Sequence, residues 1–299
     1  MGRHARARRT VLAVVAPLVW TAVQCGGGGP AAPSPSAGPP AVFVGAGDIA
    51  DCGPGAAATA RLLDALGGTL FTAGDNAYDA GTEAEFATCF APTWGRHLAR
   101  IRPSPGNHDY LTAGAAGYFG YFGDRAGPAG RGYYSFDLGA WHIVSLNSNV
   151  SVAAGSEQDR WLAADLAAAR QRCVLAFWHH PRFSSALHGS DASLTDIWRT
   201  LYDARADLVV NGHDHAYERF APQTPAGAAD SIRGIREFVV GTGGAPLYPF
   251  VQIEPNSEVR YNGGWGVLKL SLDETGYAWS FIPAEGAAFA DSGTGACVP

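Results

Sequence analysis

Five short polar fragments constrain the fold of this chain more than any other feature, because each follows an apolar run that predicts a β-strand. They read GD at 47–48, GDNAY at 74–78, GNHD at 106–109, WHHP at 178–181 and GHDH at 212–215. Side chains at the carboxyl ends of strands meet at one edge of an open α/β sheet. Carboxylate, amide, phenol and imidazole groups gathered in this way suit two metal ions better than one. The pattern therefore predicts a metal-dependent hydrolase.

The composition is that of a globular protein with an acidic charge balance. The 299 residues are 47% hydrophobic and 16% charged, which is enough for a large core. The net charge is −6, and without residues 1–25, which hold four arginines and no acid, 17 basic residues face 27 acidic ones, a net charge of −10. Such a charge disfavours a nonspecific nucleic-acid binder, so we expect no nucleic-acid partner. A small phosphorylated substrate remains compatible, because bound metal ions would dominate the local field.

The first 40 residues predict export. Arginines within residues 3–9 precede an apolar run at 11–23, which is typical of a secretory signal and short for a membrane span. Cys25 follows this run and resembles the lipidated cysteine of a bacterial lipoprotein. Gln24 stands where a small residue is usual, so lipidation and plain signal cleavage both stay open. Residues 26–40 are nearly all Gly, Ala, Pro and Ser, which predicts a linker between the 1–25 signal and a secreted or surface-anchored body.

The remaining four cysteines predict disulfides, because an exported chain with an even cysteine count commonly forms them. Three connectivities are possible. We favour one bridge between Cys52 and Cys89, which both lie shortly after a ligand-bearing strand end. The second would join Cys173, at the start of a predicted strand, to Cys297 near the end of the chain. The close-paired spacing of a cysteine metal site is missing.

Helix and strand patterns alternate in the first part of the body, 41–299, and strands dominate the last part. We expect helices at 55–66, 156–170 and 194–204, and a mostly helical stretch at 82–101. We expect strands at 41–47, 69–73, 133–138, 141–146, 174–177, 207–210, 237–240, 266–272 and 277–282. This order predicts one domain with two packed mixed sheets flanked by helices, a four-layer α/β/β/α sandwich.

The fragments resemble the motifs of the calcineurin-like metallophosphoesterases, and specifically those of the purple acid phosphatase branch, over about residues 41–285. The closest agreement lies in GDNAY, GNHD, HHP and GHDH. The first fragment departs from the branch, because Ala50 stands where glycine is common. Tyr78 lies three residues after Asp75, where the branch places a tyrosinate ligand. The resemblance implies the metallophosphoesterase fold and a metal-dependent phosphoric ester hydrolase.

By this resemblance, two metal ions share one carboxylate. The first ion would be held by Asp48, Asp75, Tyr78 and His215, and the second by Asp75, Asn107, His179 and His213. A phenolate is a hard anionic donor, so the Tyr78 site favours Fe(III), whereas the second site suits Zn, Mn or Fe(II). The family places its ligand before x-Pro, which selects His179 over His180, and alternation along a strand turns only one of the two toward the site.

The resemblance also implies a mechanism. A metal-bound hydroxide would attack the phosphorus of a phosphomonoester directly, without a protein nucleophile. His108 would contact the phosphate or protonate the leaving group, and Asp109 could orient it. His188, nine residues after His179, occupies the place of a histidine that contacts substrate, and the alternative is a solvated loop histidine.

Other residues and functions stay open. Arg182 and Arg219 could neutralise phosphate, but surface ion pairs are the favoured interpretation, and we interpret His97 and His142 as structural. A phosphodiesterase or nucleotidase on the same scaffold would use the same ligands. A metal-loaded surface binding protein without turnover is a more distant alternative. A serine hydrolase is disfavoured because the chain has no G-x-S-x-G, and its only lysine, Lys269, is in no phosphate-binding loop.

Overall fold

The computed structural model describes residues 1–2, 38–284 and 288–298 of the chain. The predicted signal segment with Cys25, and all of the predicted linker before residue 38, lie outside the described residues. Among the described residues, none of the helices is both long and apolar enough to cross a bilayer.

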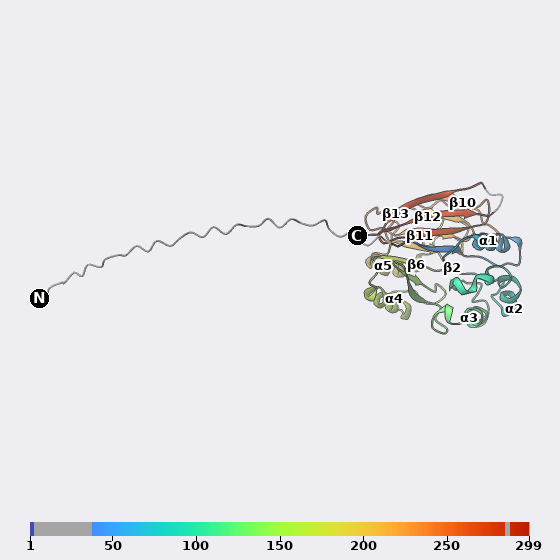
Figure 1. Cartoon of the computed structure of the whole chain (residues 1–299), viewed down its shortest axis with the longest axis horizontal. Helices are drawn as coiled ribbons and strands as arrows, with labels where there is room; N and C mark the ends of the chain where they lie inside the picture. Colours follow the sequence, from blue (N-terminus) through green and yellow to red (C-terminus); the bar gives the residue numbers. More distant parts are fainter. Residues whose placement is uncertain (3–37, 285–287, 299) are drawn as a thin grey trace, which may run out of the picture. The chain divides into compact units, whose positions relative to one another are not determined.

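The first sheet carries three of the five polar fragments. Its order is β13-β12-β11-β1-β2-β3. Figure 1 labels four of these strands, β2, β11, β12 and β13. The strands are β1 (Ala41–Ala46), β2 (Thr69–Ala73), β3 (Ile101–Ser104), β11 (Gly266–Leu272), β12 (Gly276–Pro283) and β13 (Asp291–Ala296). Strands β1, β2 and β3 are parallel, and the other pairings are antiparallel. The sheet is therefore mixed, and its parallel half ends in the fragments that begin at residues 47, 74 and 106.

The second sheet carries the remaining two fragments. Its order is β10-β8-β9-β7-β6-β5-β4. The strands are β4 (Tyr134–Leu138), β5 (Trp141–Ser145), β6 (Cys173–Phe177), β7 (Leu208–Asn211), β8 (Tyr217–Phe220), β9 (Arg236–Val240) and β10 (Ser257–Tyr261). Strands β5, β6, β7 and β9 run parallel to one another, and the other pairings are antiparallel. The metal-ligand residue types follow β6 and β7.

The two sheets pack face to face through aromatic side chains. The Phe43 ring on β1 lies 4.9 Å from Phe71 on β2 and 5.6 Å from Phe177 on β6, measured between ring centroids. All three side chains are fully buried. Burying each of them contributes roughly 1.5–3 kcal/mol relative to exposure, so this interface fixes how the sheets meet.

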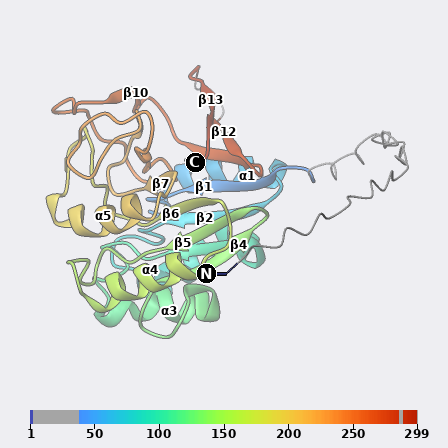
Figure 2. The same cartoon turned by 90° about the vertical axis from the view of Figure 1, so that its left-hand side faces the viewer.

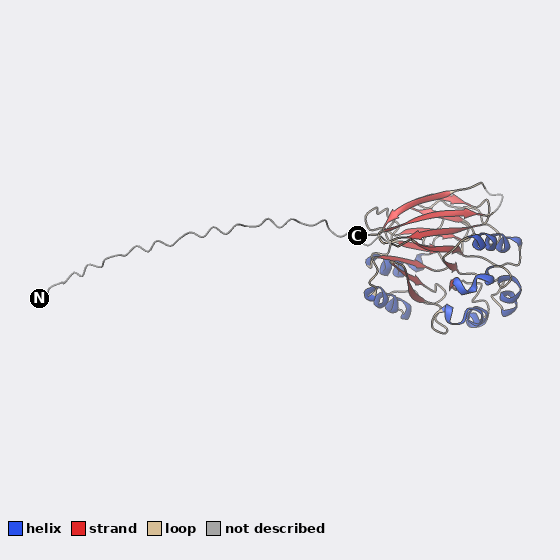
Figure 3. Cartoon of the chain, in the orientation of Figure 1, coloured by secondary structure: helices blue, strands red, loops and turns tan. Residues whose placement is uncertain are grey.

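Helices cover the outer faces, as Figure 3 shows in blue. The helices are α1 (Pro54–Ala65), α2 (Glu83–Glu85), α3 (Ala116–Phe122), α4 (Glu157–Ala168) and α5 (Thr195–Asp203). Leu162 of α4 and Trp198 of α5 share one buried cluster with Val209 of the second sheet. On the other side, Ala60 and Leu63 of α1 belong to the cluster that contains the first sheet. The predicted four-layer sandwich of two mixed sheets flanked by helices is confirmed.

Both expected disulfides are present. Cys52 bonds Cys89, with Cα atoms 4.7 Å apart. Cys173, at the start of β6, bonds Cys297, with Cα atoms 5.5 Å apart. The first bridge ties the loop after β1 to the segment after α2, and the second ties the chain end to β6 of the second sheet. Figure 2 labels β1 and β6 in a second view of the cartoon.

The stretch at 82–101 is mostly helical, as expected, but it is divided into three short pieces. The structure has α2, a π-helical turn at Phe86–Phe90 and a 3₁₀ helix at Trp94–Arg100. Pro92 lies at the break, and a proline has no backbone N–H to continue the helical hydrogen bonding. Shorter 3₁₀ turns lie at Ala113–Ala115, Gly123–Ala126 and Ala192–Leu194. Helix α3 and strands β8, β10 and β13 were not predicted.

Candidate metal centre

The carboxyl ends of five parallel strands meet at one edge of the two sheets. Strands β1, β2 and β3 bring Asp48, Asp75 and Asn107 from the first sheet, and β6 and β7 bring His179 and His213 from the second. The loops of the two sheets touch, because a Cβ added to Gly47 would lie 3.1 Å from the Cα of Gly212. The site is therefore built across both sheets.

Two glycines in the fragments leave room for candidate ligands. A Cβ on Gly74 would lie 2.4 Å from His179 Nδ1, and this glycine also has a φ of +79°. A Cβ on Gly106 would lie 2.1 Å from Asp75 Oδ1. Any larger residue at either position would collide with a side chain of the site, which explains why the fragments carry glycine there.

Three candidate ligands have left-handed backbone. Their φ angles are +61° for Asp48, +48° for Asp75 and +69° for His213. Such a conformation is costly for residues other than glycine and tends to occur at functional sites. Partly buried hydrogen bonds hold it in place: His213 N–H donates to Asp48 Oδ2 at 2.8 Å, and His108 N–H donates to Asp75 Oδ1 at 2.8 Å.

Tyr78 is the centre of one group of side chains, which we call the tyrosine half. Its Oη lies 3.1 Å from Asp48 Oδ1, 3.1 Å from Asp75 Oδ2 and 3.2 Å from His215 Nε2. His215 Nε2 also lies 3.2 Å from Asp48 Oδ1. Four ligand atoms thus converge within contact distance of one another.

A second group, the histidine half, lies on the other side of Asp75. His179 Nε2 lies 2.8 Å from Asn107 Oδ1 and 3.2 Å from His213 Nδ1. The same nitrogen lies 3.3 Å from Asp75 Oδ2. One carboxylate oxygen of Asp75 therefore faces both halves, which is the geometry that a bridging ligand needs.

Backbone carbonyls orient two of the imidazoles. His179 Nδ1 lies 2.9 Å from the carbonyl oxygen of Ala73, and His215 Nδ1 lies 2.6 Å from that of Pro246. A carbonyl oxygen only accepts, so each Nδ1 carries a proton and donates it, and each Nε2 presents its lone pair to the centre. This outer hydrogen bond is the usual support of a metal-binding histidine.

The donor set fits cations. Lone pairs of Asp48, Asp75, Asn107, His179 and His215 point at one another with few protons to share among them. Buried acceptors that face one another repel unless a proton or a metal ion lies between them. Oxygen and imidazole donors of this kind suit iron, zinc and manganese.

Without a metal ion, protons reduce the repulsion between these buried acceptors, and the pKa values show which groups carry them. Burial lowers the pKa of His179, but the charges of Asp75 and Asp48 outweigh it and raise that pKa to about 9. Burial raises the pKa of Asp75, but His179 and His108 outweigh it and lower that pKa to about 2. Burial, together with the charges of Asp48 and Asp75, raises the pKa of the Tyr78 phenol well above its usual value. A cation would reverse that effect on the phenol.

Comparison with known proteins gives these residues a family. The family described as calcineurin-like phosphoesterase matches residues 31–217. The chain belongs to this family. The superfamily and the purple acid phosphatase-like branch predicted from the five fragments are confirmed.

The curated relatives of this phosphoesterase family member include purple acid phosphatases. Purple acid phosphatase 18 of Arabidopsis thaliana is 28% identical over 237 residues, covering 69% of the chain and 52% of that protein. Purple acid phosphatase 22 of the same plant is 38% identical over 94 residues, covering 29% of the chain and 22% of that protein. An uncharacterised protein of Mycobacterium tuberculosis is 31% identical over 202 residues, covering 56% of the chain and 37% of that protein. The chain spans about half or less of the length of these relatives.

Solved structures share the fold. A purple acid phosphatase from yellow lupin superposes with a TM-score of 0.67 at 20% identity, over 85% of this chain and 53% of that chain. A dimetal phosphatase from Danio rerio superposes with a TM-score of 0.61 at 13% identity, over 88% of this chain and 100% of that chain.

His108 lies at the mouth of the phosphoesterase centre, but Asp109 does not orient it. His108 Nδ1 lies 2.6 Å from the carbonyl oxygen of Asp79, which therefore accepts its proton, and Nε2 lies 4.0 Å from Asp75 Oδ2. The Asp109 carboxylate is fully buried and accepts from Gly106 N–H at 2.8 Å and from Asn76 Nδ2 at 2.9 Å. Burial and the Asp75 charge raise the pKa of Asp109 to about 7. Its observed contacts support the fragment backbones.

Three further aromatic rings surround the histidines. The exposed His188 ring stacks on His213 with centroids 4.4 Å apart. The Tyr248 ring stacks on His215 at 3.9 Å, a contact that the sequence pattern did not signal. The His180 ring lies 4.3 Å from His213, and its Nδ1 lies 2.7 Å from Ser148 Oγ. One ligand atom each of His179, His180 and His213 lies within 4.8 Å of the others, so His180 borders the histidine half.

The remaining polar candidates lie outside the two halves. Arg219 forms ion pairs with Asp291 at 2.8 Å and with Glu258, and Arg182 lies over the Phe183 ring at 4.3 Å. His97 pairs with Asp64 at 3.1 Å. His142 lies between Asp137 at 2.9 Å and Asp165 at 2.8 Å. Within the part of the chain that the structure describes, none of the four contacts the seven candidate ligands.

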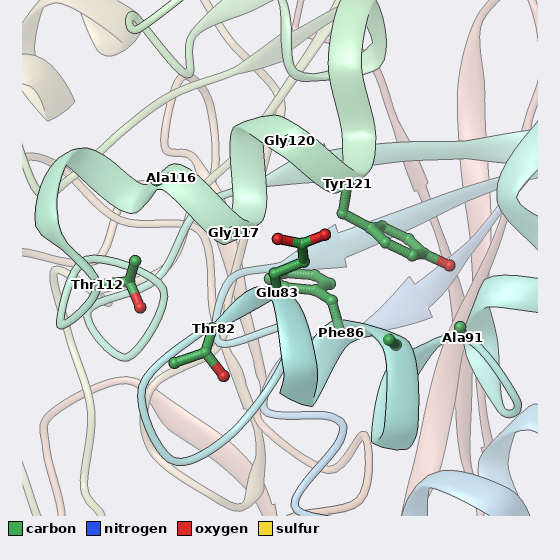
Figure 4. A pocket seen from close by; sticks show the side chains of 10 residues that line it. Thr82, Glu83, Phe86, Ala91, Thr112, Ala116, Gly117, Gly120 and Tyr121 are labelled. Atoms are coloured by element: carbon green, nitrogen blue, oxygen red, sulfur yellow. The ribbon is translucent and has the colours of Figure 1, made fainter.

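A cavity of about 690 Å³ lies next to the centre but is not part of it (Figure 4). Its lining residues are Thr82, Glu83, Phe86, Ala87, Ala91, Thr112, Ala116, Gly117, Gly120 and Tyr121. The turn at 79–82 contacts both places, because Asp79 O accepts from His108 and Ala80 O accepts from the Thr112 hydroxyl at 2.6 Å. None of the candidate ligands lines the cavity.

Proposed function

We propose that this protein is an exported dinuclear-metal phosphoesterase that hydrolyses phosphomonoesters, as a purple acid phosphatase does. One observation carries the proposal: a single oxygen, Asp75 Oδ2, lies 3.1 Å from Tyr78 Oη and 3.3 Å from His179 Nε2. That atom joins an oxygen-rich group to an imidazole-rich one. Membership of the phosphoesterase family and similarity to purple acid phosphatases support the same chemistry.

The two halves call for different ions. Asp48, Tyr78 and His215, with the shared Asp75, form a harder donor set, which favours Fe(III). Asn107, His179 and His213, with the same Asp75, suit Zn, Mn or Fe(II). Two such ions would lower the pKa of a water molecule and neutralise phosphate oxygens.

The protein's own groups would bind the ester and move the proton. The His108 Nδ1–H bond to Asp79 O leaves Nε2 as the free nitrogen on the Asp75 side of the ring. About 31% of this side chain is exposed, so a substrate can reach it. When protonated, Nε2 can donate to a phosphate oxygen or to the departing alkoxide, which is the role of a general acid. His188 lies over His213 on the other side and can contact the same phosphate.

Diesterase or nucleotidase activity on the same scaffold is the main alternative, since the ligands would be identical. The test is elemental analysis of the purified protein together with hydrolysis of p-nitrophenyl phosphate and bis-p-nitrophenyl phosphate. We expect two metal ions per chain and faster hydrolysis of the monoester. A preference for the diester would overturn the monoester assignment. Full metal occupancy without hydrolysis of any ester would favour the non-catalytic binding protein.

Export is supported by the two disulfides, since such bonds persist in oxidising compartments. Cys25 would anchor the protein to the membrane if its thiol is lipidated. The test is incorporation of labelled fatty acid into the full chain expressed in a bacterium with lipoprotein processing, with Cys25→Ala as the control. Label that persists in the variant would exclude this anchor, and a protein retained in the cytoplasm would overturn export.

A further inference from the structure

The loop at 181–191 carries His188 and is held by buried carboxylates from the strands beneath it. Glu237 on β9 accepts from Arg182 N–H at 3.1 Å, and Glu218 on β8 accepts from Ser185 N–H at 2.8 Å. Asp214, in the GHDH fragment, accepts from the His188 backbone itself. All three acidic residues are buried. The loop thus depends on side-chain acceptors where a helix or strand would use backbone ones.

Asp214 makes the contacts nearest to the histidine. Its Oδ1 accepts from His188 N–H at 2.8 Å, and its Oδ2 accepts from Gly189 N–H at 3.2 Å and from the Ser184 hydroxyl. The residue is fully buried. Hydrogen bonds to a buried carboxylate are stronger than neutral ones, so this contact strongly restrains the backbone at 188–189.

The His188 ring has little else to hold it. The side chain is exposed, and among the described residues neither ring nitrogen forms a hydrogen bond with another group. Its contacts are ring contacts, with His213 at 4.4 Å and Tyr248 at 5.3 Å. The position of the ring therefore follows from where the backbone places Cα.

We propose that Asp214 is a positioning residue, whose carboxylate holds the 188–189 backbone so that the His188 ring lies over His213 at the mouth of the metal centre. His213 and His215, the neighbours of Asp214 in sequence, face the centre, while the side chain between them reaches the loop. The GHDH fragment thereby supplies two candidate ligands and a support for a substrate-contacting histidine. The link to phosphate rests on the proposed function; the positioning of the ring does not.

The first test needs no activity. In the metal-free protein, the chain's nine histidines give separate ring C–H signals in NMR spectra, and the His188 signal is the one that disappears in His188→Ala. Stacking on His213 shifts this signal upfield. In Asp214→Ala we expect it to move to the position of an unstacked histidine. An unchanged His188 signal in the folded variant would overturn the proposal.

Glu218→Ala is the matched control. Glu218 also accepts three hydrogen bonds, two from Ser185 and one from Ser257, and two of these hold the same loop. We expect a similar loss of thermal stability but no movement of the His188 signal. If this control moved the signal as far as Asp214→Ala does, the loop would act as one unit and Asp214 would have no special role.

Amide hydrogen exchange tests the same contact in the wild-type protein, so the proposal can still be decided if the variant does not fold. In the wild-type protein, the His188 and Gly189 amides should exchange at least about 10-fold more slowly than in an unstructured peptide, because Asp214 accepts from both. Exchange at the peptide rate would overturn the anchoring without any variant.

Phosphate binding tests the functional part. In the metal-loaded protein, inhibition by inorganic phosphate should weaken about 10-fold in His188→Ala and to a similar extent in Asp214→Ala, with unchanged metal content. The double variant should be no weaker than His188→Ala alone, because Asp214 acts through that ring. Additive losses would overturn this pathway. If no ester is hydrolysed, the proposed function fails. The NMR signal of the His188 ring still tests whether Asp214 positions that ring.

Discussion

The two halves of the metal centre share Asp75 but are built from different chemistry. In the tyrosine half, a phenol and two carboxylates meet one imidazole nitrogen within about 3.2 Å. In the histidine half, an amide oxygen and a second imidazole nitrogen lie next to His179 Nε2, which itself lies 3.3 Å from the same Asp75 oxygen. One carboxylate can therefore bridge a site of hard oxygen donors and a site of softer imidazole donors. Such a pair of sites suits two different metal ions.

The halves also differ in how protons stabilise them before metal binds. In the tyrosine half, carboxylates and burial raise the pKa of the Tyr78 phenol, so the hydroxyl keeps its proton. In the histidine half, burial and the neighbouring His179 charge hold the pKa of His213 well below its usual range, so His213 stays neutral. A metal entering the histidine half meets one neutral ring, His213, but must displace a proton from His179, whose pKa is raised to about 9; a metal entering the tyrosine half must displace the phenol proton.

Replacing Asp75 by asparagine should disrupt both halves of the metal centre, because this residue belongs to both. We expect Asp75→Asn to lose metal from both sites and to lower turnover at least about 1,000-fold, since each ion contributes several kcal/mol to the transition state. Elemental analysis and the rate of monoester hydrolysis measure the two effects.

Asp64→Asn is the control for a lost carboxylate, because Asp64 is half exposed and pairs with Arg96 at 2.6 Å, away from the centre. It should leave both metals and the rate unchanged. If Asp75→Asn kept either metal at full affinity, Asp75 would belong to one half only.

Replacing His108 should separate substrate chemistry from metal binding. The ring lies 4.0 Å from Asp75 Oδ2 and is held through Asp79 O, so it belongs to neither half. We expect His108→Ala to retain both metals and to lose about 100-fold in turnover, the range for a missing general acid. The loss should be smaller for an ester with a good leaving group, such as p-nitrophenyl phosphate, than for an alkyl phosphate. Equal losses on both esters would remove the acid role and leave phosphate binding.

The sequence predicted the halves because their residues occur in contiguous fragments at strand ends. The glycines at 74 and 106 and the order of the strands appear as local patterns in the sequence. These patterns were enough to predict the four-layer sandwich and the convergence of the ligands. The support around the ligands was less visible. Tyr248 stacks on His215 from a loop without periodicity, and Asp79 O replaces Asp109 as the partner of His108.

The errors in the fold have two origins. The helical pattern over 82–101 contained Pro92, whose local cost outweighed the propensity of its neighbours. The unpredicted β13 has the sequence DSGTGA, which is poor in strand-forming residues and forms a strand because it pairs with β12. Pro92 was visible in the sequence, whereas the pairing of β13 with β12 joins separate segments, which a single sequence does not display.

Tyr78→Phe should weaken metal binding in the tyrosine half alone. The phenol oxygen contacts Asp48, Asp75 and His215, and apart from the shared Asp75 it contacts no residue of the histidine half among the described residues. We expect about 10-fold weaker binding of the ion in the tyrosine half, unchanged binding in the other, and loss of the visible absorption of a tyrosinate–iron pair. Metal titration followed by absorption and elemental analysis separates the two sites. A colourless, fully active wild type would show that the tyrosine half does not bind Fe(III).

His142 shows what an imidazole between two carboxylates does without a metal, and its variant should have the smallest effect. Hydrogen bonding to Asp165, opposed by burial and reinforced by Asp137, raises the pKa of His142. A raised histidine pKa stabilises the fold below the unfolded value of about 6.5, and this stabilisation disappears as the pH rises through the folded value. We therefore expect His142→Gln to cost about 1 kcal/mol near pH 6 and less near pH 9, measured by urea unfolding of the metal-free protein. His97→Gln is the opposite control: burial lowers the pKa of His97, so the cost of its replacement should shrink toward acidic pH. A cost for His142→Gln that does not change with pH would mean that His142 supports the fold by packing, and that its two carboxylates do not favour the charged ring.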